Sequence, residues 1–319
     1  MPDYDIFNGD ADGICSLIQL RKAEPREATL ITGVKRDINL VSQVEARAGD
    51  RLTVLDVSMD KNRAALDLAL AAGANVFYVD HHFPGDIPDH AALTAIINES
   101  PDVCTAALVN GHLDGAFLDW AVVGAFGDNL KTTAESLANT LEISGTDLES
   151  LGQLGVYLNY NGYGPTIEDL HFHPRDLYLK CLAAEGALEF VHSDPAFQQL
   201  SAGYQQDMRS VADLQPFKAS SATAAYLLPD QAWARRVSGV FSNDLVTSHP
   251  DRAHAVLTEK ANGNYLVSVR APLNRKRGAA ELCMQFPTGG GREAAAGIND
   301  LPDTALDEFI EKFEIAYRV

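Results

Sequence analysis

The chain has 319 residues, of which 46% are hydrophobic and 22% are charged, a composition that excludes a disordered protein and allows two domains with cores of their own. Its formal net charge of −19 opposes a broad grip on duplex DNA, because such binding depends on Lys and Arg side chains that neutralise phosphates. Large nucleic acids are therefore disfavoured as partners.

Short apolar runs alternate with segments of helical spacing in the first hundred residues. Strands are predicted at residues 4–7, 28–34, 51–57, 76–79 and 95–97, and helices at 13–22 and 61–72. Alternation of this kind predicts a parallel sheet with helices on both faces, and thus an α/β fold.

The middle of the chain has mainly helical spacing. A turn at Pro101 opens a predicted helix that runs through Val109, and an apolar helix at 117–126 follows. The helical pattern at about 133–191 is broken by the Gly- and Asn-rich run 159–165. We expect a loop there, in which Tyr160 and Tyr163 either stack on a nucleotide base or, as we favour, pack locally.

A polar helical stretch at 194–214 ends at Pro216 and is predicted to connect two domains. Beyond it, residues 222–228, 236–241, 254–260 and 265–270 predict strands or an alternation of strand and helix, and 304–317 predicts an amphipathic helix. We expect an N-terminal domain at residues 1–190, a helical connector at 191–216 and a smaller α/β domain at 217–319.

Cysteine spacing and the N-terminal sequence indicate the compartment. Cys15, Cys104, Cys181 and Cys283 form no C-x-x-C pair, which favours reduced, buried thiols over a zinc site or a disulfide framework. The first residues lack the basic and apolar segments of a signal peptide, and no stretch approaches the roughly 18 apolar residues of a membrane helix. We expect a cytoplasmic protein with no membrane contact.

Acidic and imidazole side chains follow several of the predicted elements: Asp10 and Asp12 after the first strand, Asp56 after the third, Asp80-His81-His82 after the fourth, and Asp128 after the apolar helix. Each has a structural alternative, namely a turn, a helix N-cap or a buried histidine pair. Together, at the ends of strands in an α/β sheet, they predict an oxygen-rich site with one or two imidazoles. Such a site suits Mn²⁺ or Mg²⁺ better than structural zinc.

In this order the segments resemble the motifs of the DHH phosphoesterase superfamily, which is named for the triplet present here as Asp80-His81-His82. Asp10-x-Asp12-Gly13, Asp56 and Asp128 match its other N-terminal motifs. The run Gly289-Gly290-Gly291-Arg292-x-x-Ala295-Ala296-Gly297 is similar to the Gly-Gly-Gly-His-x-x-Ala-Ala-Gly signature of the DHHA1 substrate domain. The resemblance spans nearly the whole chain and implies a DHH domain followed by a DHHA1 domain.

The resemblance also implies a division of labour around two metal ions. Asp56 would bridge the ions, Asp12, His81 and Asp128 would complete one shell, and Asp10 with residue 8 would serve the other. His82 would face the substrate phosphate and either stabilise its charge or protonate the leaving group. Asp80 would lie behind the histidines and orient them.

Two residues depart from the pattern. Position 8, where relatives carry His or Asp, is Asn8, whose neutral amide predicts weaker binding of one of the two ions. Arg292 replaces the histidine of the Gly-rich signature and offers a permanent charge for phosphate, but no proton exchange near neutral pH. We expect Arg292, Arg270 and the glycines at a helix N-terminus to bind substrate, with an ordinary surface or strand-end arginine as the alternative at each position.

The implied reaction is hydrolysis of a phosphoester or phosphoanhydride bond by a water that two Mn²⁺ ions activate, with Mg²⁺ as an alternative, in a cleft between the domains. We expect a short oligonucleotide or a (di)nucleotide as substrate. A single-strand-specific exonuclease on longer DNA or RNA, a pyrophosphate or polyphosphate hydrolase, and a non-catalytic nucleotide-binding homologue are the alternatives. RNA or DNA preference, cleavage polarity and the choice between monomer and homodimer stay open.

Overall fold

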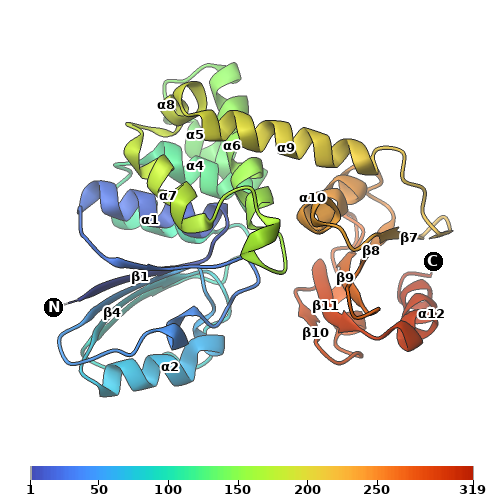
Figure 1. The fold of residues 1–319 in the computed structure, drawn as a ribbon, viewed down its shortest axis with the longest axis horizontal. Helices are drawn as coiled ribbons and strands as arrows, with labels where there is room; N and C mark the ends of the chain where they lie inside the picture. The colour runs from blue at the N-terminus through green and yellow to red at the C-terminus, as the bar shows by residue number, and fades with distance from the viewer. Residues whose placement is uncertain (1, 319) are drawn as a thin grey trace. The chain divides into compact units, whose positions relative to one another are not determined.

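The computed structural model describes residues 2–318 and divides into two compact units, Met1–Gly203 and Tyr204–Val319. Figure 1 shows their elements. The division falls within α9 (Pro195–Val211), which lies in the stretch that the sequence predicts as a connecting helix.

The N-terminal unit contains a five-stranded parallel sheet, as predicted. Its strand order is β2-β1-β3-β4-β5, formed by β1 (Asp3–Phe7), β2 (Thr29–Ile31), β3 (Arg51–Leu55), β4 (Asn75–Asp80) and β5 (Leu93–Ile97). Because parallel strands all end at one edge of the sheet, the polar motifs after β1, β3 and β4 meet there.

Helices cover both faces of this sheet (Figure 1). On one face, α2 (Met59–Ala71) and the short 3₁₀ turn η1 (Leu40–Gln43) bury a core that includes Val54 and Tyr78. On the other face lies α1 (Ala11–Ala23), which is buried from Ala11 to Arg21. It is surrounded by α3 (Thr105–His112), α4 (Leu118–Gly127), α6 (Gly145–Gly162) and α7 (Pro174–Ala183). The smaller elements of this unit are α5 (Lys131–Ala138), η2 (Ile167–Asp169) and α8 (Ala187–Ser193).

One ion pair lies inside this packed layer. The Arg21 guanidinium donates to both carboxylate oxygens of Asp5, over 2.7 Å from Nε and 2.5 Å from Nη2, and also to the Thr53 hydroxyl. Both charged side chains are at most 5% exposed. The bidentate geometry compensates each charge for its lost hydration, so removing one partner leaves the other uncompensated.

The C-terminal unit is the predicted smaller α/β domain and holds a six-stranded mixed sheet of order β10-β11-β9-β8-β7-β6. Its strands are β6 (Lys218–Ala219), β7 (Thr223–Leu228), β8 (Ala253–Glu259), β9 (Tyr265–Arg270), β10 (Gly289–Gly291) and β11 (Ala295–Leu301). Strands β7 and β8 pair in parallel because α10 (Ala232–Ser248) connects them as a crossover helix. The opposite face packs on α11 (Ala279–Cys283) and on α12 (Leu306–Ala316), which follows η3 (Asp303–Ala305).

The predicted loop at 159–165 is wrong at its start, because α6 continues through Gly162. Asn161 accounts for this: its side chain donates to the Phe172 carbonyl and accepts the backbone N–H groups of His171 and Phe172. Tyr160 is fully buried and its hydroxyl lies 2.8 Å from His171 Nε2. These contacts outweigh the low helix propensity of the segment, and Tyr160 packs locally, as favoured.

The predicted helix N-terminus at the glycine run is also wrong. Gly289–Gly291 is a strand that pairs antiparallel with β11, so the motif is a β-hairpin. Gly291 has φ of 139°, and a side chain on it would overlap the backbone of Ala296. The glycines therefore permit close strand pairing, where a helix start had been expected.

The four cysteines are buried and free, as predicted. Burial raises the pKa values of the Cys15, Cys104 and Cys181 thiols well above their usual range, which makes them poor nucleophiles. Among residues 2–318 no helix combines the length and apolar character that a membrane crossing requires.

Candidate metal centre

The predicted acidic residues of the N-terminal unit converge at the carboxyl edge of the parallel sheet. Asp10 caps α1, Asp56 follows β3, Asp80 ends β4 and Asp128 caps the end of α4. Asp56 has φ of 58°, a left-handed conformation that costs roughly 1 to 3 kcal/mol in a non-glycine residue. Backbone strain at the end of a buried strand is typical of functional positions.

His81 stands at the centre of this cluster. Its Nδ1 lies 2.8 Å from the carbonyl oxygen of Val103, so Nδ1–H donates there and Nε2 carries the lone pair. Nε2 lies 3.5 Å from Asp56 Oδ1, 3.9 Å from Asp12 Oδ2 and 3.8 Å from Asp128 Oδ2. The ligand atoms lie within 4.8 Å of one another in two groups that share His81, namely Asp12 with His81 and Asp128, and Asp56 with His81 and His82. Ligands about 2.1 Å from an octahedral ion are about 3 Å apart, so each group would need a small contraction to hold an ion.

The first turn of α3 fixes two of these carboxylates. The N–H groups of Thr105 and Ala106 donate to the two oxygens of Asp12 over 2.8 and 2.7 Å, and the Thr105 hydroxyl donates to Asp56 Oδ1 over 3.1 Å. Sequence reasoning missed Thr105 and the Val103 carbonyl, because both come from a segment distant in the chain. The position of Thr105 near the start of a predicted helix was the sequence feature that could have indicated its role.

The cluster concentrates negative charge out of water. Asp12 and Asp56 are at most 2% exposed. Burial, and then the charges of Asp12 and Asp10, raise the pKa of Asp56 well above its usual range, and burial likewise raises the pKa of Asp12. A divalent cation would offset this charge. Carboxylates and one imidazole suit Mn²⁺ or Mg²⁺, so the residues present fit the predicted metal.

His82 and Asp80 form a pair beside the cluster. His82 Nδ1 lies 2.7 Å from Asp80 Oδ1 and 3.9 Å from Asp56 Oδ1. The His82 side chain is 36% exposed, whereas Asp80 is fully buried. Asp80 therefore orients His82, while the Val103 carbonyl orients His81.

Asn8 and Asp10 have different partners from the other acidic residues. Asn8 Oδ1 accepts the N–H of Asp10, and Nδ2 donates to the carbonyl oxygen of Lys35 over 3.1 Å. Asp10 Oδ1 accepts the N–H groups of Asp12 and Gly13, and Oδ2 pairs with the Lys35 ammonium. Although burial opposes it, this ammonium lowers the pKa of Asp10. Sequence reasoning missed Lys35, which follows β2 at the same sheet edge.

The predicted substrate residues of the C-terminal unit lie at one end of its sheet. Arg270 ends β9, pairs with Ala295 of β11, and donates from Nε to Asn243 Oδ1 over 2.8 Å. Arg292 is exposed in the turn between β10 and β11, and its N–H donates to the Ala295 carbonyl. Two arginines at this end of the sheet are chemically suited to bind an anion. Their role in binding substrate stays a prediction.

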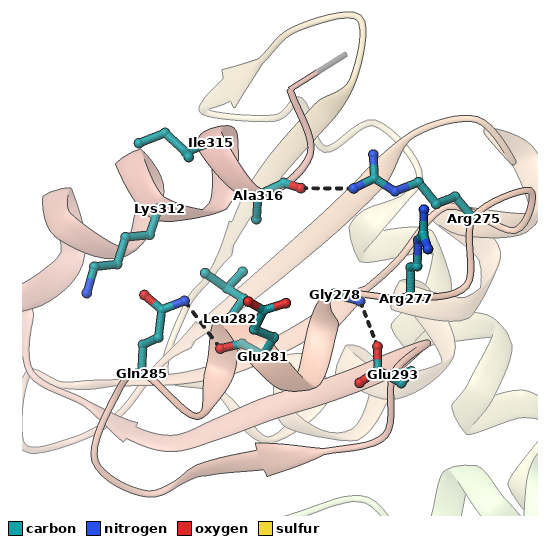
Figure 2. Close-up of a pocket in the computed structure, with 10 residues that line it drawn as sticks. All are labelled: Arg275, Arg277, Gly278, Glu281, Leu282, Gln285, Glu293, Lys312, Ile315 and Ala316. Carbon is teal, nitrogen blue, oxygen red and sulfur yellow. Dashed lines mark hydrogen bonds between the residues drawn. The ribbon is translucent and has the colours of Figure 1, made fainter.

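A hollow of about 470 Å³ in the same unit lies between α11, α12 and the loop before α11 (Figure 2). Its charged lining mixes Arg275, Arg277 and Lys312 with Glu281 and Glu293. None of the predicted substrate residues lines it. With basic and acidic groups interspersed, it has no strong preference for an anion, and we assign it no role.

No protein-family model and no curated protein sequence matches this chain. Solved structures do. An exonuclease RecJ bound to manganese matches with a TM-score of 0.64 and 18% identity, covering 100% of this chain and 90% of RecJ. RecJ from Thermus thermophilus in complex with Mn²⁺ has the same score and identity, but 52% of that chain is covered.

The pGpG-specific phosphodiesterase PggH from Vibrio cholerae matches with a TM-score of 0.59 and 15% identity, over 98% of this chain and 97% of PggH. At these identities the likeness shows the fold. The shared fold extends over the whole of this chain, and the Asp and His side chains of the motifs that resemble those of DHH phosphoesterases lie together in it.

Proposed function

We propose that this protein is a metal-dependent phosphoesterase that hydrolyses phosphodiester or terminal phosphate bonds of short oligonucleotides or (di)nucleotides. The observation that carries the proposal is the convergence of Asp12, Asp56 and Asp128 on His81 Nε2, within 3.5 to 3.9 Å. The fold shared with RecJ and with a pGpG-specific phosphodiesterase supports it.

In this proposal Asp12, Asp56, His81 and Asp128 hold Mn²⁺, or alternatively Mg²⁺. A bound divalent ion supplies Lewis acidity and lowers the pKa of water towards neutrality. Val103 and Thr105 keep the ligand atoms in place, because their hydrogen bonds fix the His81 ring and two of the carboxylates. Asn8 and Asp10, the remaining positions predicted to bind metal, contact Lys35.

His82 is the proposed catalytic side chain. Asp80 accepts the hydrogen of His82 Nδ1, and Nε2 is the ring atom proposed to contact a phosphate oxygen. When Nε2 is protonated, the buried carboxylate of Asp80 stabilises the imidazolium, and the ring can stabilise the phosphoryl charge or give a proton to the leaving oxygen. Arg270 and Arg292 are proposed to bind the distal part of the substrate.

The net charge and the similar structures support this substrate class. The net charge of −19 disfavours binding of long duplexes. PggH, whose fold this chain shares, is named as a phosphodiesterase specific for pGpG, which is a dinucleotide. A second candidate is an exonuclease on longer single strands, which the RecJ likeness over 100% of this chain favours. A series of substrate lengths separates the two.

The test is a Mn²⁺-supplemented panel of dinucleotides, short RNA, short single-stranded DNA, a long single strand and polyphosphate, with products identified by mass. We expect the dinucleotide to be cleaved fastest, and His82→Ala to lose about 10²- to 10⁴-fold in kcat. His90→Ala is the control, because His90 is an exposed histidine of the same unit. No hydrolysis of any substrate would contradict the proposal, and a rate that rises steeply with length would favour the exonuclease.

A further inference from the structure

A lysine side chain reaches into the acidic edge of the sheet. The Lys35 ammonium pairs with Asp10 Oδ2 and donates to Asn159 Oδ1 over 2.9 Å. It also lies 5.7 Å from the centre of the Tyr163 ring. Asp10 is 3% exposed, so its carboxylate needs a positive partner out of water. Lys35 supplies that charge on the side of the cluster where the sequence predicts a second metal ion.

The backbone of Lys35 is held as firmly as its side chain. Its N–H donates to the Gly162 carbonyl over 2.9 Å, and its own carbonyl accepts from Asn8 Nδ2 over 3.1 Å. Gly9 lets the segment approach, because a side chain on Gly9 would overlap the carbonyl oxygen of Gly33. The loop after β1, which carries Asn8 and Gly9, and the end of α6 at Gly162 therefore both hold the backbone of Lys35 in place.

These contacts use the groups that a second ion would need. Both polar atoms of Asn8 are engaged with backbone, Oδ1 to Asp10 and Nδ2 to Lys35. Asp10 Oδ1 already accepts two N–H bonds, and Oδ2 faces the ammonium. Asp12 differs in degree, because both of its oxygens accept one N–H and keep a lone pair, whereas in Asp10 only Oδ2, the oxygen that faces the ammonium, keeps one. An ammonium at Asp10 also repels a cation placed beside it.

We propose that the Lys35 ammonium takes the place of the second metal ion, so that the centre combines one divalent ion with one fixed lysine. The inference rests on the proposed function and concerns the composition of its site. The resemblance predicts a metal ligand at Asn8. In this protein Asn8 instead holds the backbone of Lys35, so the two residues act together to place the ammonium beside Asp10. The ammonium has three N–H groups, of which Asp10 and Asn159 take two, and the third is available for a phosphate oxygen.

Metal stoichiometry tests this directly. The metal-free protein is titrated with Mn²⁺ by calorimetry, and the bound ion is counted by elemental analysis and observed by electron paramagnetic resonance. We expect one ion per wild-type chain with the hyperfine pattern of an isolated Mn²⁺. Lys35→Met and Lys35→Met with Asn8→His should bind a second ion at least tenfold more tightly than wild type, with the magnetic coupling of an ion pair.

Two control variants and the number of Mn²⁺ ions bound by the wild-type protein complete the test. Lys35→Arg keeps the charge and should bind one ion, as should Lys22→Met, which removes an anchored lysine whose partners are backbone carbonyls. Two tightly bound, coupled ions in wild type would overturn the inference and leave the proposed function intact. A Lys35→Met protein that still binds one ion would also overturn it. No bound ion in wild type would refute the proposed function itself, and the inference with it.

Discussion

A buried histidine in the C-terminal unit makes the stability of that unit depend on pH. His254 lies on β8 with its side chain fully buried, beside the rings of Tyr226 and His249. Burial, reinforced by the charge of Arg252, lowers its pKa from 6.5 to about 4. The folded protein therefore keeps this imidazole neutral at pH values where the unfolded chain has already bound a proton.

The sign and size of the effect follow from linkage. As pH falls below 6.5 the unfolded state takes up the proton first, so stability is lost between about pH 6.5 and pH 4 and changes no further below that. A pKa difference of this size lowers the free energy of unfolding by about 3 kcal/mol over the whole pH range, and about 2 kcal/mol of that loss falls between pH 7 and pH 5. Solvent screening is small because the ring is not exposed.

The assay is urea unfolding followed by the fluorescence of Trp233, which lies on α10 in the same unit. A Trp120→Phe background removes the signal of the N-terminal unit. We expect His254→Leu to lose about 2 kcal/mol less than its parent between pH 7 and pH 5. His249→Gln, which changes an exposed histidine, should keep most of the dependence. Identical pH slopes for the parent and His254→Leu would refute the reasoning.

Three substitutions test the packing and the metal site of the N-terminal unit. Arg21→Met leaves Asp5 buried without its partner and should lower the free energy of unfolding by about 3 to 5 kcal/mol, with recovery on adding Asp5→Leu, as measured by urea denaturation. Thr105→Val removes a hydrogen bond to a metal-site carboxylate and should weaken Mn²⁺ binding by about 10-fold or more in calorimetry, whereas unchanged affinity would contradict its role. Gly9→Ala should cost about 1 to 3 kcal/mol in thermal unfolding because it overlaps the loop that carries Lys35, while Gly145→Ala, with open space around it, should cost nothing.

The sheet of the N-terminal unit was predictable from sequence because its strands are short, apolar and bounded by helices of regular spacing. The errors fall where tertiary contacts outweigh local preference. Asn159 to Gly162 has the composition of a loop, yet Asn161 bonds to three backbone groups of a later segment and the helix persists. The glycine run after α11 was expected at a helix start, but strand pairing with β11 decides its conformation.

The acidic half of the site was predictable because parallel strands bring their carboxyl ends to one edge. Asp12, Asp56, His81 and Asp128 come together as the motifs indicate. Lys35 and Thr105 were not predictable, since each acts through a contact between segments far apart in the chain. Asn8 was recognised as a departure from the motif, but its role in anchoring Lys35 needed the structure.

The most direct test of the metal centre is anomalous diffraction at the manganese edge from crystals of the wild-type protein grown with Mn²⁺. We predict one strong peak bounded by His81 Nε2 and the carboxylates of Asp12, Asp56 and Asp128, with Lys35 still paired to Asp10. A structure with no peak among these four side chains would contradict the central claim that they form the metal centre of a phosphoesterase.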